Sequence, residues 1–311
     1  MAQQNLPPLH SMQQEERWSH ETSPVPCQKI FDLAYADLSA SQQVDLYLPI
    51  EGEGPLPLLI LIHGGAFKFG DKRSSPAQPN PIAFRALGRG YALAALNYRM
   101  SGEEPFPALV QDVKTAVRWL RAHAGPYHLD PTRFAAWGDS AGAYLATMLG
   151  VSYGIPELEG AELGNADYSS QVQAVIDWYG PTDFLLMDHQ LAEAGLPSRP
   201  GGEHDAPDSP ESELMGFPIQ QHPELVRAAN PITYIRREYP PPPFLIYHGS
   251  RDHVVPVGQS RILRDALLPV MDADHLIFDD SMPVDHGGEP DFYLPANVER
   301  MLYFLDKHLR K

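Results

Sequence analysis

Short apolar runs, each long enough for one strand, recur along the chain and alternate with segments of helical periodicity. The runs occupy residues 56–65, 91–99, 133–140, 173–181 and 242–250. The run "LPLLILIHGG" (56–65) lacks polar alternation, which is typical of a strand buried on both faces of a mostly parallel sheet. Strands that alternate with helices favour βαβ units with right-handed crossovers. The sequence therefore predicts an α/β fold in which helices flank a mostly parallel central sheet.

The two ends of the chain complete this pattern. Segments 29–37 and 43–50 alternate partly between apolar and polar residues, which predicts an antiparallel pair of strands. Segment 275–280 is the last predicted strand, and helices are predicted over 107–124, 260–268 and 297–309. Residues 1–28 are polar and contain proline, and we expect them to form an N-terminal arm.

Residues 182–229 interrupt the alternation of strands and helices. The segment is rich in Gly, Pro, Asp and Glu, and it is too long for a plain connection between two core strands. Ser209-Pro210 has the form of a helix N-cap followed by proline at the first helical position. We therefore expect a core of residues 29–181 and 230–311 and a cap insertion at 182–229. The alternative is a disordered surface loop.

Composition narrows the class of protein. The 311 residues carry a formal net charge of −17, which argues against nucleic acid or an anionic membrane surface as a partner. Cys27 is the single cysteine, so an intramolecular disulfide is impossible. The N-terminus lacks the basic and apolar regions of a secretory signal, and no apolar run has the length of a membrane span. We expect a cytoplasmic protein.

Polar and glycine-rich loops follow four of the predicted strands. These loops are His63–Phe67, Gly138–Gly142, Arg251–Pro256 and the stretch around His286. In doubly wound sheets, ligands bind beyond the carboxyl ends of the strands, where these loops would meet. Together the loops would supply backbone amides, a serine, a carboxylate and an imidazole.

The pentapeptide Gly138-Asp139-Ser140-Ala141-Gly142 lies between a predicted strand and a predicted helix. A G-x-S-x-G sequence at such a turn can form a nucleophile elbow, which holds the serine in a strained conformation and requires small neighbours. The alternative is an ordinary Gly/Ser turn without a chemical role.

The other loops supply what a serine nucleophile needs. A serine hydroxyl is a weak nucleophile and requires an adjacent base, for which histidine is suited near neutral pH. A carboxylate then fixes the imidazole tautomer, and N–H donors stabilise the oxyanion. The order Ser140, Asp252, His286 agrees with the order expected for an α/β sheet with such an elbow.

Other histidines and acids compete for these roles. The competitors are His63, His248, His253, His275, Asp279, Asp280 and Asp285. His286 is favoured because it lies in a glycine-containing loop after the last strand, and Asp252 because it follows a buried strand in the context D-x-V-V-P. Asp139 could tune the site or form a structural salt bridge. We expect His63 to brace the loop that follows it.

Several motifs resemble those of a known superfamily. These are "HGGAF" (63–67), "GDSAGAYLA" (138–146), "DWYGPTDF" (177–184), "PPFLIYHGSRDHVVP" (242–256) and "DHGG" (285–288). The chain resembles serine esterases of the α/β-hydrolase superfamily, in the hormone-sensitive-lipase-like branch. Within that branch it is similar to bacterial bifunctional acetyl/feruloyl carboxylesterases.

The resemblance implies roles for individual residues. Ser140 would be the nucleophile, Asp252 the acid and His286 the base. The backbone N–H groups of Gly65, Ala66 and Ala141 would form the oxyanion hole. This last set departs from the usual HGGG motif at Ala66, which should keep its N–H in place unless that position requires a positive φ.

Two further residues are candidates for the substrate pocket. Phe67 stands where the family often has tryptophan, which would alter the acyl pocket. Asp183 lies where the predicted cap begins and could line the pocket or cap a helix.

These observations predict a serine carboxylesterase acting on short-acyl or small aromatic esters. One alternative is an amidohydrolase of the arylformamidase type, and another is a non-catalytic binding module on the same fold. No Cys/His cluster has the spacing of metal ligands, and no phosphate-binding loop follows a strand, so we expect neither metal nor cofactor. The expected partner is a small-molecule ester, and a homodimer is compatible with the sequence.

Overall fold

The computed structural model describes residues 25–50, 54–73, 81–197 and 199–310. Most of the predicted N-terminal arm lies outside this part of the chain. Within the described residues, the central sheet has eight strands in the order β1-β2-β4-β3-β5-β6-β7-β8. The strands are β1 (Cys27–Ala34), β2 (Gln43–Pro49), β3 (Leu56–Ile62), β4 (Ala92–Leu96), β5 (Leu129–Asp139), β6 (Ala174–Trp178), β7 (Phe244–Tyr247) and β8 (Leu276–Asp279).

The predicted mostly parallel sheet is confirmed. Strands β4, β3, β5, β6, β7 and β8 pair in parallel, while β1 pairs antiparallel with β2 and β2 antiparallel with β4. Strand β1 begins earlier than expected, because Cys27 and Gln28 pair with Pro49 and Leu48 of β2. These two residues of the predicted arm therefore belong to the sheet.

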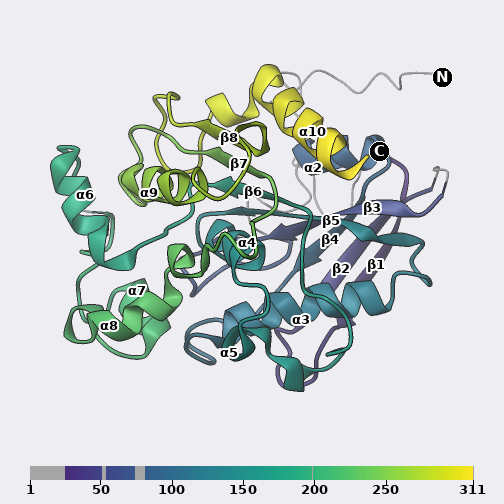
Figure 1. Cartoon of the computed structure of the whole chain (residues 1–311), viewed down its shortest axis with the longest axis horizontal. Coiled ribbons are helices and arrows are strands. Elements are labelled where there is room, and N and C mark those ends of the chain that lie inside the picture. Colours follow the sequence, from purple (N-terminus) through teal and green to yellow (C-terminus); the bar gives the residue numbers. More distant parts are fainter. Residues whose placement is uncertain (1–24, 51–53, 74–80, 198, 311) are drawn as a thin grey trace.

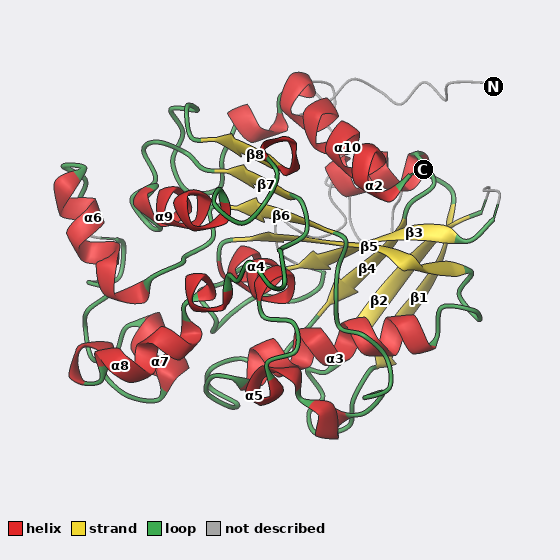
Figure 2. Ribbon diagram, viewed as in Figure 1, coloured by secondary structure: helices red, strands yellow, loops and turns green. Residues whose placement is uncertain are grey.

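Helices cover both faces of the sheet (Figures 1 and 2). They are α2 (Pro81–Gly88), α3 (Ala108–Ala122), α4 (Ala141–Val151), α5 (Pro156–Glu159), α6 (Met187–Glu193), α7 (Pro210–Met215), α8 (Pro223–Val226), α9 (Gly258–Leu267) and α10 (Pro295–Leu309). Short 3-10 helices occupy Ala161–Leu163, Phe184–Leu186, Ile219–Gln221, Arg227–Ala229, Pro231–Tyr234, Ala273–His275 and Asp291–Tyr293. The sequence did not predict α2, whose eight residues are too few for a clear helical period.

The apolar run of β3 is buried from both sides. Leu58, Ile60 and Ile62 belong to a core layer shared with α3 and α4. Leu59 and Leu61 belong to the layer on the opposite face, which includes residues of α2 and α10. Successive side chains of a strand point to opposite faces, so an unbroken apolar run is what a strand between two helical layers requires.

Residues 182–229 contain α6, α7 and α8, which form a group on the left of Figure 1 beside α9. Helix α7 begins at Pro210, and the Ser209 hydroxyl accepts the N–H of Ser212 at 3.0 Å, as the N-cap motif predicted. The N–H of Phe106 donates to the carbonyl of Leu214 at 2.7 Å, which ties α7 to the core. The segment therefore has regular structure over its described residues. Its action as a cap stays a prediction.

A buried contact between a histidine and a glutamate lies in this segment. Nδ1 of His204 lies 3.0 Å from Oε1 of Glu211, and both side chains are buried. Nε2 of the same histidine lies 2.9 Å from the carbonyl oxygen of Val254. The contact joins the segment to the loop that follows β7.

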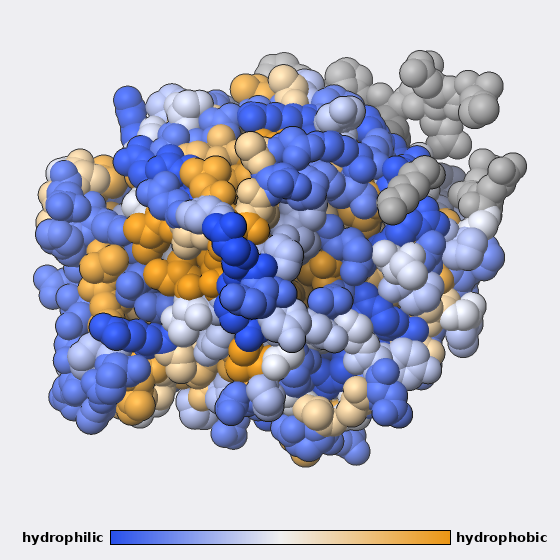
Figure 3. All heavy atoms as spheres, in the orientation of Figure 1, coloured by the Kyte–Doolittle hydropathy of each residue, from blue (hydrophilic) through white to orange (hydrophobic). Residues whose placement is uncertain are grey.

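The face of the molecule drawn in Figure 3 is mostly polar, and most of its apolar residues lie in the left half of the view. That half carries α9 and the α6–α8 group. Within the residues that the structure describes, no helix is long and apolar enough to cross a membrane.

Candidate active site

Ser140 forms the turn between β5 and α4. Its backbone has φ 52° and ψ −121°, outside the regions that side chains usually allow, as an elbow requires. A Cβ on Gly142 would lie 2.0 Å from the carbonyl oxygen of Ile62, and one on Gly138 would lie 2.2 Å from the backbone of Gly142. The two glycines of the motif are therefore required by close backbone contacts, and the expected strained serine is confirmed.

The structure brings Ser140, His286 and Asp252 together from three separate loops. Nε2 of His286 lies 3.2 Å from Oγ of Ser140, and its Nδ1 lies 2.8 Å from Oδ2 of Asp252. Asp252 is buried, whereas 23% of the His286 side chain is exposed. The imidazole thus bridges hydroxyl and carboxylate and has one side open to solvent.

The surroundings of Asp252 stabilise its charged form. Its Oδ1 accepts the backbone N–H groups of Val254 at 2.9 Å and Val255 at 2.8 Å. Burial alone would raise the pKa of this carboxyl. The charge of His286 and hydrogen bonds from His248 and His286 outweigh burial and hold the pKa well below its usual range.

The opposite shift applies to His286. Burial acts to lower the pKa of the imidazole, but the negative charge and the hydrogen bond of Asp252 outweigh it. Asp139 and Asp285 add to the raising effect. The pKa of His286 therefore lies above its ordinary value of 6.5.

The His63 side chain packs beneath the loop that follows β3 and contacts its backbone. Its ring stacks on Tyr98 with 4.6 Å between centroids, and its Nδ1 lies 2.7 Å from the carbonyl oxygen of Gly64. The Tyr98 hydroxyl donates to the His63 carbonyl at 2.8 Å. Burial lowers the pKa of His63, so the ring is neutral near pH 7. These contacts agree with the bracing role expected for His63.

The glycine loop lies directly against the elbow. The N–H of Gly64 donates to Oδ1 of Asp139 at 3.2 Å. A Cβ on Gly64 would lie 2.7 Å from Oδ2 of Asp139 and 3.2 Å from Cβ of Ser140. This contact holds Gly64, the residue before Gly65 and Ala66, against the elbow. Asp139 thus links the elbow to the glycine loop.

Backbone conformation distinguishes Gly65 and Ala66. Gly65 has φ 121°, and any Cβ there would lie 2.0 Å from the Phe69 carbonyl oxygen. Ala66 has φ 52°, in the left-handed region that favours glycine. The position that is the third glycine in the usual HGGG motif therefore does require a positive φ. Ala66 adopts this conformation at a cost in strain. Ala141 is the first residue of α4, where N–H groups lack partners within the helix.

The two pocket candidates have structural contacts. Phe67 is 2% exposed, and its ring packs on Tyr144 at 5.5 Å and on Phe184 at 5.9 Å. Oδ1 of Asp183 accepts the N–H of Leu185 at 3.1 Å and so caps the short helix Phe184–Leu186. The structure places Phe67 in the core and gives Asp183 the capping contact considered in the sequence. Roles in substrate binding stay predictions.

None of the competing residues described next takes the place of Asp252 or His286 beside Ser140, although His248 lies 3.5 Å from Oδ2 of Asp252. His248 is buried between Oγ of Ser260 and the carbonyl of Val255, at 2.7 and 2.8 Å. Nδ1 of His253 lies 2.6 Å from Oδ1 of Asp285. Separate ion pairs join Asp279 to Arg300 and Asp280 to Arg261.

Sequence reasoning missed Tyr179 in this site. Its buried ring meets the His286 ring edge to face, with 4.7 Å between centroids. The signal was present, because Tyr179 directly follows β6 and so lies at the same edge of the sheet as the other loops. Its contact with His286 depends on the fold, which the local pattern does not encode.

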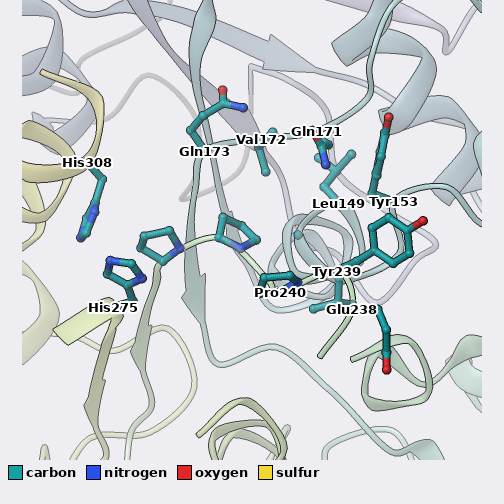
Figure 4. A pocket seen from close by; sticks show the side chains of 14 residues that line it. Leu149, Tyr153, Gln171, Val172, Gln173, Glu238, Tyr239, Pro240, His275 and His308 are labelled. Carbon is teal, nitrogen blue, oxygen red and sulfur yellow. The ribbon is translucent and has the colours of Figure 1, made fainter. Parts of the chain in front are cut away.

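A hollow lies at the end of the sheet opposite Ser140 (Figure 4). Its volume is about 480 Å³, and residues that precede β6, β7 and β8 line it together with the end of α4. His275, at its rim, lies with Asp272 and Asp274 in a group whose side-chain atoms are close enough to hold a metal ion. Asp274 is also paired with Lys307 at 3.2 Å, and both acids are exposed. The expectation that the protein needs no metal stays a prediction.

The fold and the arrangement of Ser140, His286 and Asp252 define a protein with an α/β-hydrolase fold and the site geometry of a serine hydrolase. Residues 44–267 match the BD-FAE family, and the chain belongs to that family. The resemblance to esterases of the hormone-sensitive-lipase-like branch is thereby confirmed.

Named relatives agree with this assignment. The chain is 29% identical to the probable carboxylic ester hydrolase LipM of Mycobacterium tuberculosis over 77% of its own length and 52% of that protein. It is 33% identical to the esterase LipC of the same organism over 70% of its length and 49% of that protein. The chain spans about half the length of these curated relatives.

Solved structures show the same fold. A truncated carbohydrate esterase from gut microbiota superposes with a TM-score of 0.78 at 27% identity, covering 91% of this chain and 97% of that one. A bifunctional GH43-CE protein of Bacteroides eggerthii superposes with a TM-score of 0.79 at 29% identity, covering 90% of this chain and 35% of that one.

Proposed function

We propose that the protein is a serine carboxylesterase that hydrolyses short-acyl or small aromatic esters through an acyl-enzyme on Ser140. The observation that carries the proposal is the position of His286, with Nε2 3.2 Å from Oγ of Ser140 and Nδ1 2.8 Å from Oδ2 of Asp252. This arrangement can deprotonate the serine and stabilise the imidazolium that results.

The reaction has two halves. Oγ of Ser140 attacks the ester carbonyl while Nε2 of His286 takes the hydroxyl proton. The oxyanion accepts hydrogen bonds from the backbone N–H groups of Gly65, Ala66 and Ala141. The C–O bond to the alcohol then breaks, His286 gives the proton to the departing alcohol, and the acyl group stays bound to Oγ of Ser140. In the second half, His286 activates a water molecule that releases the acid and regenerates Ser140.

The substrate class follows from the relatives and from charge. Two structural relatives are named as carbohydrate esterases or carry the label CE, which supports small acyl esters such as acetylated sugars as substrates. A net charge of −17 disfavours action at an anionic lipid surface. We also propose that the protein is cytoplasmic.

We further propose that it forms a homodimer, which sedimentation of the purified protein would test.

The test is hydrolysis of p-nitrophenyl esters from acetate to decanoate by the wild-type protein and by Ser140→Ala. We expect the highest kcat/KM on acetate or butyrate and no rate above background in the variant. N-formylkynurenine serves as the competing substrate. If the protein hydrolyses the formamide but none of the esters, the function is that of an amidohydrolase instead of an esterase. If it hydrolyses neither, the result favours a binding module.

A further inference from the structure

We propose that Tyr179 is a positioning residue that holds the His286 imidazole in line between Asp252 and Ser140. The inference rests on the proposed function, since it assigns His286 the role of the base. The structural relationship that carries it is the edge-to-face contact of the two rings, with 4.7 Å between centroids and 60° between planes.

The His286 ring needs support of this kind. The next two residues are Gly287 and Gly288, with φ 99° and 73°, so neither offers a side chain that could pack against the imidazole. The hydrogen bond to Asp252 fixes Nδ1 but leaves the ring able to turn about that contact. A side chain packed against the ring removes this freedom and directs Nε2 at Ser140.

Tyr179 is itself held rigidly. It is 1% exposed, and its ring packs on Phe292 at 5.7 Å. Phe292 belongs to the same loop region as His286, and its N–H donates to the Gly288 carbonyl at 2.9 Å. The loop that carries His286 thus rests on the Tyr179 ring at two points.

The backbone around Tyr179 is strained and braced. Tyr179 has φ 50°, which a bulky residue rarely adopts. Its N–H donates to the Tyr247 carbonyl at 2.9 Å, and the N–H of Gly180 donates to Oδ1 of Asp177 at 2.9 Å. Strain maintained by specific hydrogen bonds beside a reactive group is expected where geometry matters for function.

The same turn also holds the serine. The N–H of Ser140 donates to the carbonyl of Trp178 at 2.9 Å. Adjacent residues at the end of β6 therefore fix the backbone of Ser140 and the ring of His286. This shared support sets the relative position of nucleophile and base.

The contact involves the ring and not the hydroxyl. Among the described residues, the buried Tyr179 hydroxyl has no hydrogen-bond partner. Tyr179→Phe should therefore keep the function, whereas Tyr179→Leu removes the aromatic ring and leaves a smaller apolar side chain. Tyr47 is the matched control, because it is also buried, lacks a hydroxyl partner in the described residues and lies in β2 away from His286.

The experiment measures kcat and KM on the best p-nitrophenyl ester for Tyr179→Leu, Tyr179→Met, Tyr179→Phe and Tyr47→Leu, with thermal unfolding of each. We expect kcat to fall about 10- to 100-fold in the Leu and Met variants at Tyr179 with KM within about twofold, since small misplacement of a catalytic group has large effects on rate. Tyr179→Phe and Tyr47→Leu should keep kcat within about twofold of wild type.

A second readout does not depend on turnover. The downfield proton resonance of the Nδ1–H group of His286, assigned by its loss in His286→Gln, should be sharp in the wild type and Tyr179→Phe and broadened or lost in Tyr179→Leu. Equal kcat in Tyr179→Leu and wild type would overturn the proposal, as would parallel losses in Tyr179→Leu and Tyr47→Leu or in Tyr179→Phe. If the wild type hydrolyses no ester, the proposed function fails, and the resonance alone then decides whether Tyr179 orients the ring.

Discussion

Asp252 and His286 are joined through one carboxylate oxygen, Oδ2, which lies 2.8 Å from Nδ1 of the imidazole. The other oxygen accepts the backbone N–H groups of Val254 and Val255. The carboxylate is therefore oriented by its own loop before it orients the histidine.

Replacing this carboxylate should cost rate more than binding. In Asp252→Asn the amide can favour the wrong imidazole tautomer, and we expect kcat on p-nitrophenyl acetate to fall about 10⁴-fold with a small change in KM. Asp280→Asn is the control, because Asp280 pairs with Arg261 on the surface. Comparable losses in both variants would contradict the assignment of Asp252.

The pH dependence of kcat/KM should report His286. The base must be neutral to accept the Ser140 proton, and its pKa lies above the ordinary 6.5 because of Asp252. We therefore expect activity to fall on the acid side with a midpoint above 6.5. In Asp252→Asn the midpoint should move to lower pH, and an unchanged midpoint would show that another group limits activity.

The same shifts affect stability in opposite directions. The raised pKa of His286 gives stability that is complete below its unfolded pKa and is lost as pH rises through its folded value. The lowered pKa of Asp252 gives stability that is present above its unfolded pKa and is lost as pH falls.

Gly64 should tolerate no side chain. A Cβ there would lie 2.7 Å from Oδ2 of Asp139 and 3.2 Å from Cβ of Ser140, so Gly64→Ala should push the glycine loop away from the elbow. We expect kcat to fall at least about 100-fold and the free energy of unfolding to drop by about 1–3 kcal/mol. Gly102→Ala is the control, since nothing lies within 4 Å of a Cβ there, and kinetics with urea unfolding compare the two.

Ala66 offers a gain in stability. Its φ of 52° costs an alanine about 1–2 kcal/mol, which glycine avoids, while glycine also gives the unfolded chain more freedom. Ala66→Gly should raise the free energy of unfolding by about 0.5–1 kcal/mol. Ala116→Gly, inside helix α3, should lower it by a similar amount. A loss of stability in Ala66→Gly would mean that the strain is smaller than the angle implies.

Two glutamates of α7 should differ in effect. Glu211 is buried against His204, and Glu211→Gln should lower the free energy of unfolding by about 1–3 kcal/mol, because it weakens a buried pair. Glu213 pairs with Lys68 near the surface, and Glu213→Gln should cost less than about 1 kcal/mol. Equal losses in urea unfolding would show that burial of the His204 pair is not what anchors the segment.

The strands were predictable because a strand that is buried on both faces has an unbroken run of apolar residues. The run at 56–65 became β3, with Leu59 and Leu61 on one face and Ile60 on the other. Ser140, Asp252 and His286 were predictable because the loops after parallel strands share one edge of the sheet. Each of these inferences needed only local pattern and topology.

Other features depend on contacts between distant residues. The positive φ of Ala66 and of Tyr179 arises from how their loops pack, and neither residue type signals it. The contact of Tyr179 with His286 joins residues far apart in the chain. The pairing of His204 with Glu211 and the arrangement of α6 to α8 likewise follow from packing of an acidic segment without a strong period.

Covalent labelling tests the central claim most directly. We would treat the wild-type protein and Ser140→Ala with a fluorophosphonate, follow p-nitrophenyl butyrate hydrolysis, and locate the adduct by peptide mass spectrometry. Stoichiometric modification of Ser140 with a matching loss of activity, and none in the variant, is the predicted result. Activity that survives labelling, or a modified residue other than Ser140, would contradict an acyl-transfer mechanism at this serine.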